Sequence, residues 1–239
     1  MTTSTPQLRQ EIQTHLTPLI DPAYLANISQ LVPTAWTILG VRVPELRTLA
    51  AELNKTHKTV GALDIAAFLD VAFAARCREE VLVGIFWLTK KQRHLTDALW
   101  PHIDQWLEQI VDWEMCDQLA TGVGAVIVAR NLALVDDLAA WTQSDNEWRR
   151  RFPAALASAL NQKGRAHAAE TLRICAPLMQ DPSPMVRKAV GWALREAGKA
   201  DEAAVFHFLQ RHRGTTPRGL LRESAQKLTP AHQAELLAQ

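Results

Sequence analysis

Apolar residues recur at helical spacing along almost the whole chain, and this periodicity limits the fold more than any other feature. Leu46, Leu49, Ala50 and Leu53 form one such stripe, a pattern typical of an amphipathic helix packed on a core. Strict two-residue alternation, which would predict strands, is rare. The sequence therefore predicts an all-α protein of about a dozen helices, each of roughly 10–16 residues.

Turn and capping residues set the expected boundaries. Asp21-Pro22, Pro44 and the cap cluster 144–146 mark helix starts. Pro153 should kink the helix that begins at Asn146 or end a short first segment, and Gly198 should be a C-cap. The expected helices are 5–18, 22–31, 44–53, 63–74, 78–89, 95–110, 113–120, 122–130, 132–141, 146–162, 166–179 and 185–197, with two or three shorter ones after them.

Helix spacing also predicts the architecture. The helices that begin at Asn146 and Pro184 are 38 residues apart (184 − 146), close to the period of a two-helix HEAT repeat. We therefore expect residues 1–239 to form one domain, an α-solenoid of HEAT-like antiparallel helix pairs. Its concave face would be the place for a large ligand.

Charge is unevenly distributed along the chain. Residues 146–239 carry 15 Lys and Arg against 8 Asp and Glu (+7), whereas residues 1–145 carry 11 against 17 (−6). A basic C-terminal part indicates an anionic partner, although uneven decoration of solvated helices would give the same count. Three cysteines without a CxxC pair fit a reducing, cytoplasmic compartment.

The sequence contains none of several motifs that mark metal, nucleotide or nucleophilic-serine chemistry. The eight histidines form no metal-binding pattern, and the chain has neither a P-loop nor a GxSxG elbow. Gly122-Val123-Gly124 lacks the third glycine of a dinucleotide-binding loop. We expect no metal and no cofactor, so an enzymatic activity would depend on carboxylate and electrostatic chemistry.

Three segments carry residue types that suit a cationic, aromatic or phosphate ligand. Trp113 and Asp117 lie one helical turn apart. The second segment is Ser144-Asp145-Asn146-x-Trp148-x-x-Arg151. The third is 186–196, in which Lys188, Trp192 and Arg195 share one helical face while Val186, Val190, Ala193, Leu194 and Ala197 supply the core. Each aromatic could instead be core and each charge a solvated one.

These segments resemble the AlkD-like alkylpurine DNA glycosylases, which are built from HEAT-like repeats. RKAVGWALRE is the most specific match, and SDNxWxxR, WxxxD, the 40–47 connector and Arg78-Glu79 support it in the correct order. The resemblance covers roughly residues 5–225. It implies that Asp117 is the catalytic carboxylate and that Trp113 and Trp192 flank the lesion nucleotide. It also implies that Arg151 and Arg195 hold DNA. We further expect Lys188 and Arg187, on the same helix as Arg195, to bind DNA.

One departure from the family concerns the lesion site. Leu31 stands where the family's well-studied type has a tyrosine, nine residues before the connector glycine, and Tyr24 is the only tyrosine. A milder change is Glu114, where aspartate is common. The missing aromatic bears on the range of lesions more than on the activity.

The sequence thus predicts a monofunctional glycosylase that removes cationic N3- or N7-alkylated purines from duplex DNA. It would act as a cytoplasmic monomer, associated with the nucleoid when bound to DNA, and without an obligate protein partner or a membrane. Two alternatives remain: a non-catalytic binder of branched or distorted DNA, and a HEAT-type protein-interaction scaffold.

Overall fold

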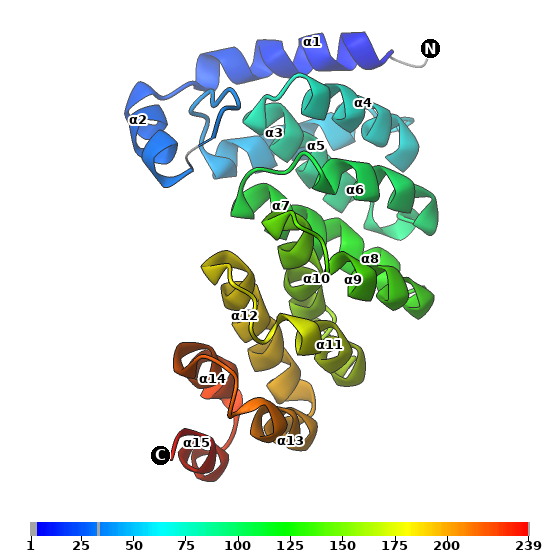
Figure 1. The fold of residues 1–239 in the computed structure, drawn as a ribbon. Coiled ribbons are helices and arrows are strands. Elements are labelled where there is room, and N and C mark those ends of the chain that lie inside the picture. Colours follow the sequence, from blue (N-terminus) through cyan, green and yellow to red (C-terminus); the bar gives the residue numbers. More distant parts are fainter. Residues whose placement is uncertain (1–3, 33, 239) are drawn as a thin grey trace. The chain divides into compact units, whose positions relative to one another are not determined.

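The computed structural model describes residues 4–32 and 34–238. That part of the chain is helical, and its only strand-like pairing is an isolated bridge between Thr37 and Cys77. The chain divides into two compact units, Met1–Val123 and Gly124–Gln239, whose helices Figure 1 labels in chain order. The single-domain organisation expected from the sequence stays a prediction.

The first unit holds two rows of helices. One row is α3 (Val43–Thr56), α5 (Arg78–Lys90) and α7 (Trp113–Leu119), and the other is α1 (Thr5–Leu16), α4 (Ala62–Ala74) and α6 (Trp100–Leu107). The short helix α2 (Pro22–Leu31) precedes α3, and 3-10 turns occupy Thr17–Leu19, Gln92–His94 and Asp97–Leu99. Helix α5 joins the rows because it packs on α3, α4 and α7, and every residue from Arg78 to Leu88 is buried.

The second unit repeats this arrangement. Helices α10 (Glu147–Ala159), α12 (Pro184–Ala200) and α14 (Arg218–Ser224) pack in one row. The other row contains α9 (Val135–Trp141), α11 (Ala168–Cys175), α13 (Glu202–His212) and α15 (Pro230–Leu237). The unit begins with α8 (Ala125–Val128), and 3-10 turns lie at Leu132–Leu134, Ala176–Leu178 and Ala225–Lys227. Within each unit the described helices pack in two rows, as in an α-solenoid, which confirms the predicted all-α solenoid fold class.

Capping side chains mark the starts of five described α-helices, α2, α7, α10, α12 and α13. Asp21 accepts from the backbone N–H groups of Ala23 and Tyr24, and Asn146 accepts from those of Trp148 and Arg149. These bonds satisfy donors that a helix N-terminus leaves unpaired. Both caps were predicted from the sequence. The buried stripe on α3 and the buried tryptophans at 36, 87, 100, 106 and 141 were also predicted correctly.

Two predicted helices differ in the structure. The segment 95–110 holds a helix only from Trp100, because Pro101 occupies its first turn and a 3-10 turn comes before it. Residues 122–130 do not form a separate helix. A π-helical turn, Ala120–Gly124, links α7 to α8, so the backbone stays helical from Trp113 to Val128.

Pro153 and Gly198 do not end their helices, although proline and glycine often mark helix ends. Helix α10 runs through Pro153 without ending. Helix α12 continues past Gly198 to Ala200, so the predicted C-cap at Gly198 is wrong. A Cβ at Gly198 would lie 3.2 Å from Leu228 Cδ2, so the glycine allows a close approach between packed segments and does not end the helix.

Candidate functional site

Helix α7 presents the predicted aromatic and carboxylate. Asp112 caps the helix by accepting from the backbone N–H groups of Glu114 and Met115 at 2.8 and 2.9 Å. Trp113 follows directly and is 39% exposed, an unusual value in a chain whose other tryptophans are buried or half-buried. Asp117, one turn later, is half-buried. The two side chains share a helical face, as their spacing predicted.

A buried arginine holds the start of this helix. Arg78 is fully buried on α5, and its Nε donates to Asp112 Oδ2 at 2.9 Å. Its Nη2 forms a second ion pair with Glu114, which is also buried. Attraction to the two carboxylates raises the pKa of the Arg78 guanidinium, against the lowering effect of burial. Both acids that flank Trp113 are therefore tied to one cation.

The next two residues of α5, Glu79 and Glu80, bind the 39–40 backbone and helix α1 at the start of α5. Glu79 accepts from the backbone N–H groups of Leu39 and Gly40, and Glu80 pairs with Arg9 of α1 at 2.7 Å. The sequence pointed to Arg78-Glu79 only through the family resemblance, and this role was missed. Three consecutive charged residues at the start of an otherwise apolar helix were the available signal, since buried charges need partners.

The two candidate positions for a second aromatic in this unit are in different surroundings. Leu31 ends α2 and is 73% exposed. Tyr24, on the same helix, is half-buried, with the Arg42 guanidinium 5.0 Å from its ring centre. Burial, and after it the negative charge of Glu114, raises the pKa of the Tyr24 phenol. Tyr24 is therefore within electrostatic reach of the residue that follows Trp113.

In the second unit, α12 carries the predicted basic and aromatic face. Lys188 is exposed, and Trp192 and Arg195 are half-buried. Arg195 Nη1 donates to Glu223 Oε1 at 3.3 Å and to Gln226 Oε1 at 3.4 Å. A Cβ on Gly191 would lie 2.9 Å from the Glu223 side chain, so this glycine lets α14 approach α12 closely.

The arginines around the start of α12 also make structural bonds. Arg151 is only 6% exposed and donates to the backbone carbonyl of Met185. Arg187 Nη1 donates to the carbonyls of Asp181 and Pro182 at 2.6 and 2.9 Å. Of the four predicted DNA-binding residues, Lys188 is the most accessible, whereas the others have donors in use within the protein.

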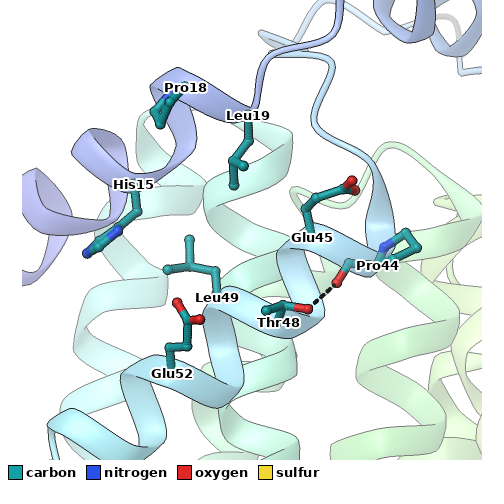
Figure 2. A pocket seen from close by; sticks show the side chains of 8 residues that line it. All are labelled: His15, Pro18, Leu19, Pro44, Glu45, Thr48, Leu49 and Glu52. Carbon is teal, nitrogen blue, oxygen red and sulfur yellow. Dashed lines mark hydrogen bonds between the residues drawn. The ribbon is translucent and has the colours of Figure 1, made fainter.

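A pocket of about 390 Å³ lies between the α1 end and α3 in the first unit (Figure 2). Its lining residues are His15, Pro18, Leu19, Pro44, Glu45, Thr48, Leu49 and Glu52. The Glu45 Oε2 atom is buried with no hydrogen-bond partner among the described residues. Two carboxylates repel phosphate, so this pocket does not suit a DNA backbone.

Metal-binding and membrane-spanning features do not occur within residues 4–32 and 34–238. There, no group of three His, Cys, Asp or Glu side chains is placed to hold a metal ion. No helix in that part combines the length and apolarity of a membrane span. Cys77, Cys116 and Cys175 are buried and form no disulfide, and burial raises the pKa of the Cys77 thiol to about 12.

Comparison with known proteins adds an independent observation. The sequence matches the family described as DNA alkylation repair enzyme over residues 12–228. The chain belongs to the DNA alkylation repair enzyme family. Among curated protein sequences, none matches this chain. A solved structure described as a predicted DNA alkylation repair enzyme from Enterococcus faecalis is 18% identical with a TM-score of 0.74, covering 88% of this chain and 97% of that one.

Membership in the DNA alkylation repair enzyme family supports a role in DNA repair and DNA as the partner. The family match spans both α7 and α12, and therefore the Trp113–Asp117 pair and the Lys188–Trp192–Arg195 face. The solved structure shares the fold at low identity, so it supports the architecture and not the role of any side chain.

Proposed function

We propose that this member of the DNA alkylation repair family is a glycosylase for cationic N3- or N7-alkylated purines in duplex DNA. The observation that carries the proposal is the α7 face, where a 39% exposed Trp113 lies one turn from the half-buried Asp117. A cation placed against the face of an exposed indole is stabilised by roughly 0.5–2 kcal/mol. A carboxylate beside it favours positive charge on an adjacent sugar.

The chemistry follows from the charge of the substrate. Alkylation at N3 or N7 makes the purine cationic, so the base leaves with the bonding electron pair and becomes neutral. Positive charge then develops on the deoxyribose, and Asp117 stabilises it as carboxylates do in sugar hydrolysis. Water adds to C1′, and its proton passes to Asp117 or to solvent. One such charge contributes roughly 2.7–4 kcal/mol, a factor of about 10²–10³ in rate.

The second unit would supply DNA contacts. Lys188 and Arg195 are cations on one face of α12, and Trp192 lies between them. Cations of this kind bind phosphates and make affinity depend on salt. Trp192 is proposed as a second aromatic contact for the damaged strand. No metal or cofactor takes part in the proposed reaction, and strand cleavage is not expected, because the sequence offers no lysine in the position of a Schiff-base nucleophile.

Release of free base from alkylated duplex DNA tests the proposal. Wild type should release N3- or N7-alkylpurine at low salt, and Asp117→Asn should be slower by about 10²–10³-fold. Glu52→Gln, which removes one negative charge from α3 of the same unit, is the matched control and should act as wild type. If wild type binds the DNA but releases no base, the protein is a DNA binder and the glycosylase proposal fails. Equal release by wild type and Asp117→Asn would remove the role of Asp117.

A further inference from the structure

We propose that Arg78 is a positioning residue that fixes the orientation of the Trp113–Asp117 face. It touches neither the substrate nor the reacting atoms, and it acts through Asp112 and Glu114. The kinetic consequence rests on the proposed glycosylase function, whereas the effect on the orientation of Trp113 does not.

The two bonds of Arg78 constrain the backbone on both sides of Trp113. Asp112 precedes the tryptophan and Glu114 follows it, and both carboxylates are drawn inward to the same buried guanidinium. Asp112 is also held by the N-terminal N–H groups of α7. With its two neighbours fixed inward, Trp113 is turned outward, which accounts for its 39% exposure. Asp117 follows on the same face because it lies four residues later.

Helix α7 is regular over seven residues, Trp113–Leu119, and a π-helical turn, Ala120–Gly124, then continues the helical backbone. A π turn shifts the register of the residues after it, so the segment beyond Gly124 does not fix the direction of Trp113. Within α7, the buried Met115, Cys116 and Leu119 set which side of the helix faces the core. The ion pairs of Arg78 add fixed points directly on both sides of Trp113.

Arginine suits this task better than lysine. Its planar guanidinium presents Nε and Nη2 to two different carboxylates in a fixed geometry, whereas an ammonium group is a single rotatable point charge. The α5 backbone that carries Arg78 is itself fixed, because Glu79 binds the 39–40 backbone and Glu80 binds Arg9. Arg78 therefore transmits the position of a rigid core helix to α7.

The first experiment measures Trp113 directly in the full-length protein labelled with 5-fluorotryptophan. Its ¹⁹F resonance is assigned with Trp113→Phe, and a soluble gadolinium chelate reports exposure. In wild type the Trp113 signal should broaden more than those of Trp87 and Trp106, which are fully buried. Arg78→Lys should shift the Trp113 signal and change its broadening, while the signals of Trp87 and Trp106 stay the same. An unchanged Trp113 signal would overturn the proposal.

The second experiment separates positioning from stability. The variant Arg78→Met/Asp112→Asn/Glu114→Gln removes the ion pairs without leaving a buried charge uncompensated, so it should fold. Its single-turnover rate of base release should fall by roughly tenfold or more, because small displacements of reacting groups are costly in rate. Its Kd for unmodified duplex DNA should be unchanged, because the proposed phosphate contacts lie on α12. Ile65→Val, a core change in α4, should keep the wild-type rate.

The two arms give distinguishable failures. A wild-type rate in the triple variant would overturn the positioning role. If wild type itself releases no base, the glycosylase function fails, and the fluorine signal of Trp113 still decides whether Arg78 sets its orientation.

Discussion

The Glu79 carboxylate accepts a hydrogen bond from the backbone N–H of Gly40 at 3.0 Å, and its other oxygen accepts from Leu39 at 2.9 Å. A charged side chain at the start of α5 thereby fixes the connector that leads into α3. Gly40 has φ +85°, in the left-handed region, and a Cβ there would lie 2.6 Å from Leu25 Cβ. The connector therefore requires glycine for both its conformation and its packing.

Gly40→Ala should destabilise the protein more than Gly164→Ala, although both glycines have a positive φ. Gly164 has φ +80°, and a Cβ there would meet nothing within 4 Å, so alanine at this position faces only backbone strain, about 1–2 kcal/mol. Alanine at position 40 adds the clash with Leu25, about 1–3 kcal/mol more. Urea unfolding of both variants measures the difference. Equal losses would show that the connector has room for a side chain.

DNA affinity should respond differently to Lys188→Ala and Arg187→Ala. Lys188 is exposed, so its loss should reduce the slope of log K against log salt by about 0.9. Arg187 Nη1 donates to the Asp181 and Pro182 carbonyls. Arg187→Ala should therefore lower the stability of the protein and leave the slope of log K against log salt nearly unchanged. Fluorescence anisotropy across a salt series, with thermal unfolding in parallel, tests both. A larger change of slope in Arg187→Ala than in Lys188→Ala would show that Arg187, and not Lys188, is the phosphate contact.

Tyr24 is expected to matter for lesion binding more than Leu31. Tyr24 is half-buried within electrostatic reach of Glu114, whereas Leu31 is 73% exposed at the end of α2. Tyr24→Leu should weaken binding of alkylated duplex by about three- to tenfold, the value of losing roughly 1 kcal/mol of aromatic contact. Leu31→Ala should bind as wild type. A loss in Leu31→Ala alone would place the missing family aromatic at position 31 after all.

The Cys77 thiol should be unreactive in the native protein. Its pKa is raised by burial from 9.0 to about 12, so about one thiol in ten thousand is ionised at pH 8, and the thiolate is the reactive form. Iodoacetamide should label position 77 only after unfolding, as mass spectrometry of the peptides would show. Fast native labelling at pH 8 would contradict the burial.

The raised pKa of Cys77 also predicts how the stability of the folded protein changes with pH. The folded pKa lies above the unfolded one, so the contribution of Cys77 is fully present below pH 9 and is lost as pH rises toward about 12. Cys77→Ala should therefore lose less stability than wild type between pH 9 and 12. An identical alkaline loss in both proteins would assign it to other groups.

Local signals in the sequence predicted most of the helices. The caps at Asp21 and Asn146 and the apolar stripe of α3 act through neighbours within one or two turns, so their effect is readable from spacing alone. The same holds for the Trp113–Asp117 pair, which needs only helical geometry. The predictions for Gly198 and for 95–110 were wrong because packing on Leu228 and a preceding 3-10 turn are not visible in local spacing.

The sequence by itself determined the helical content, the DNA alkylation repair family, and the aromatic and carboxylate on one face of α7. Only the tertiary structure decided what holds that face outward. Arg78 is 34 residues from Asp112 and 36 from Glu114 in the chain, and no periodicity links residues so far apart. Buried charges choose partners by three-dimensional proximity and desolvation, which arise only when α5 and α7 pack together.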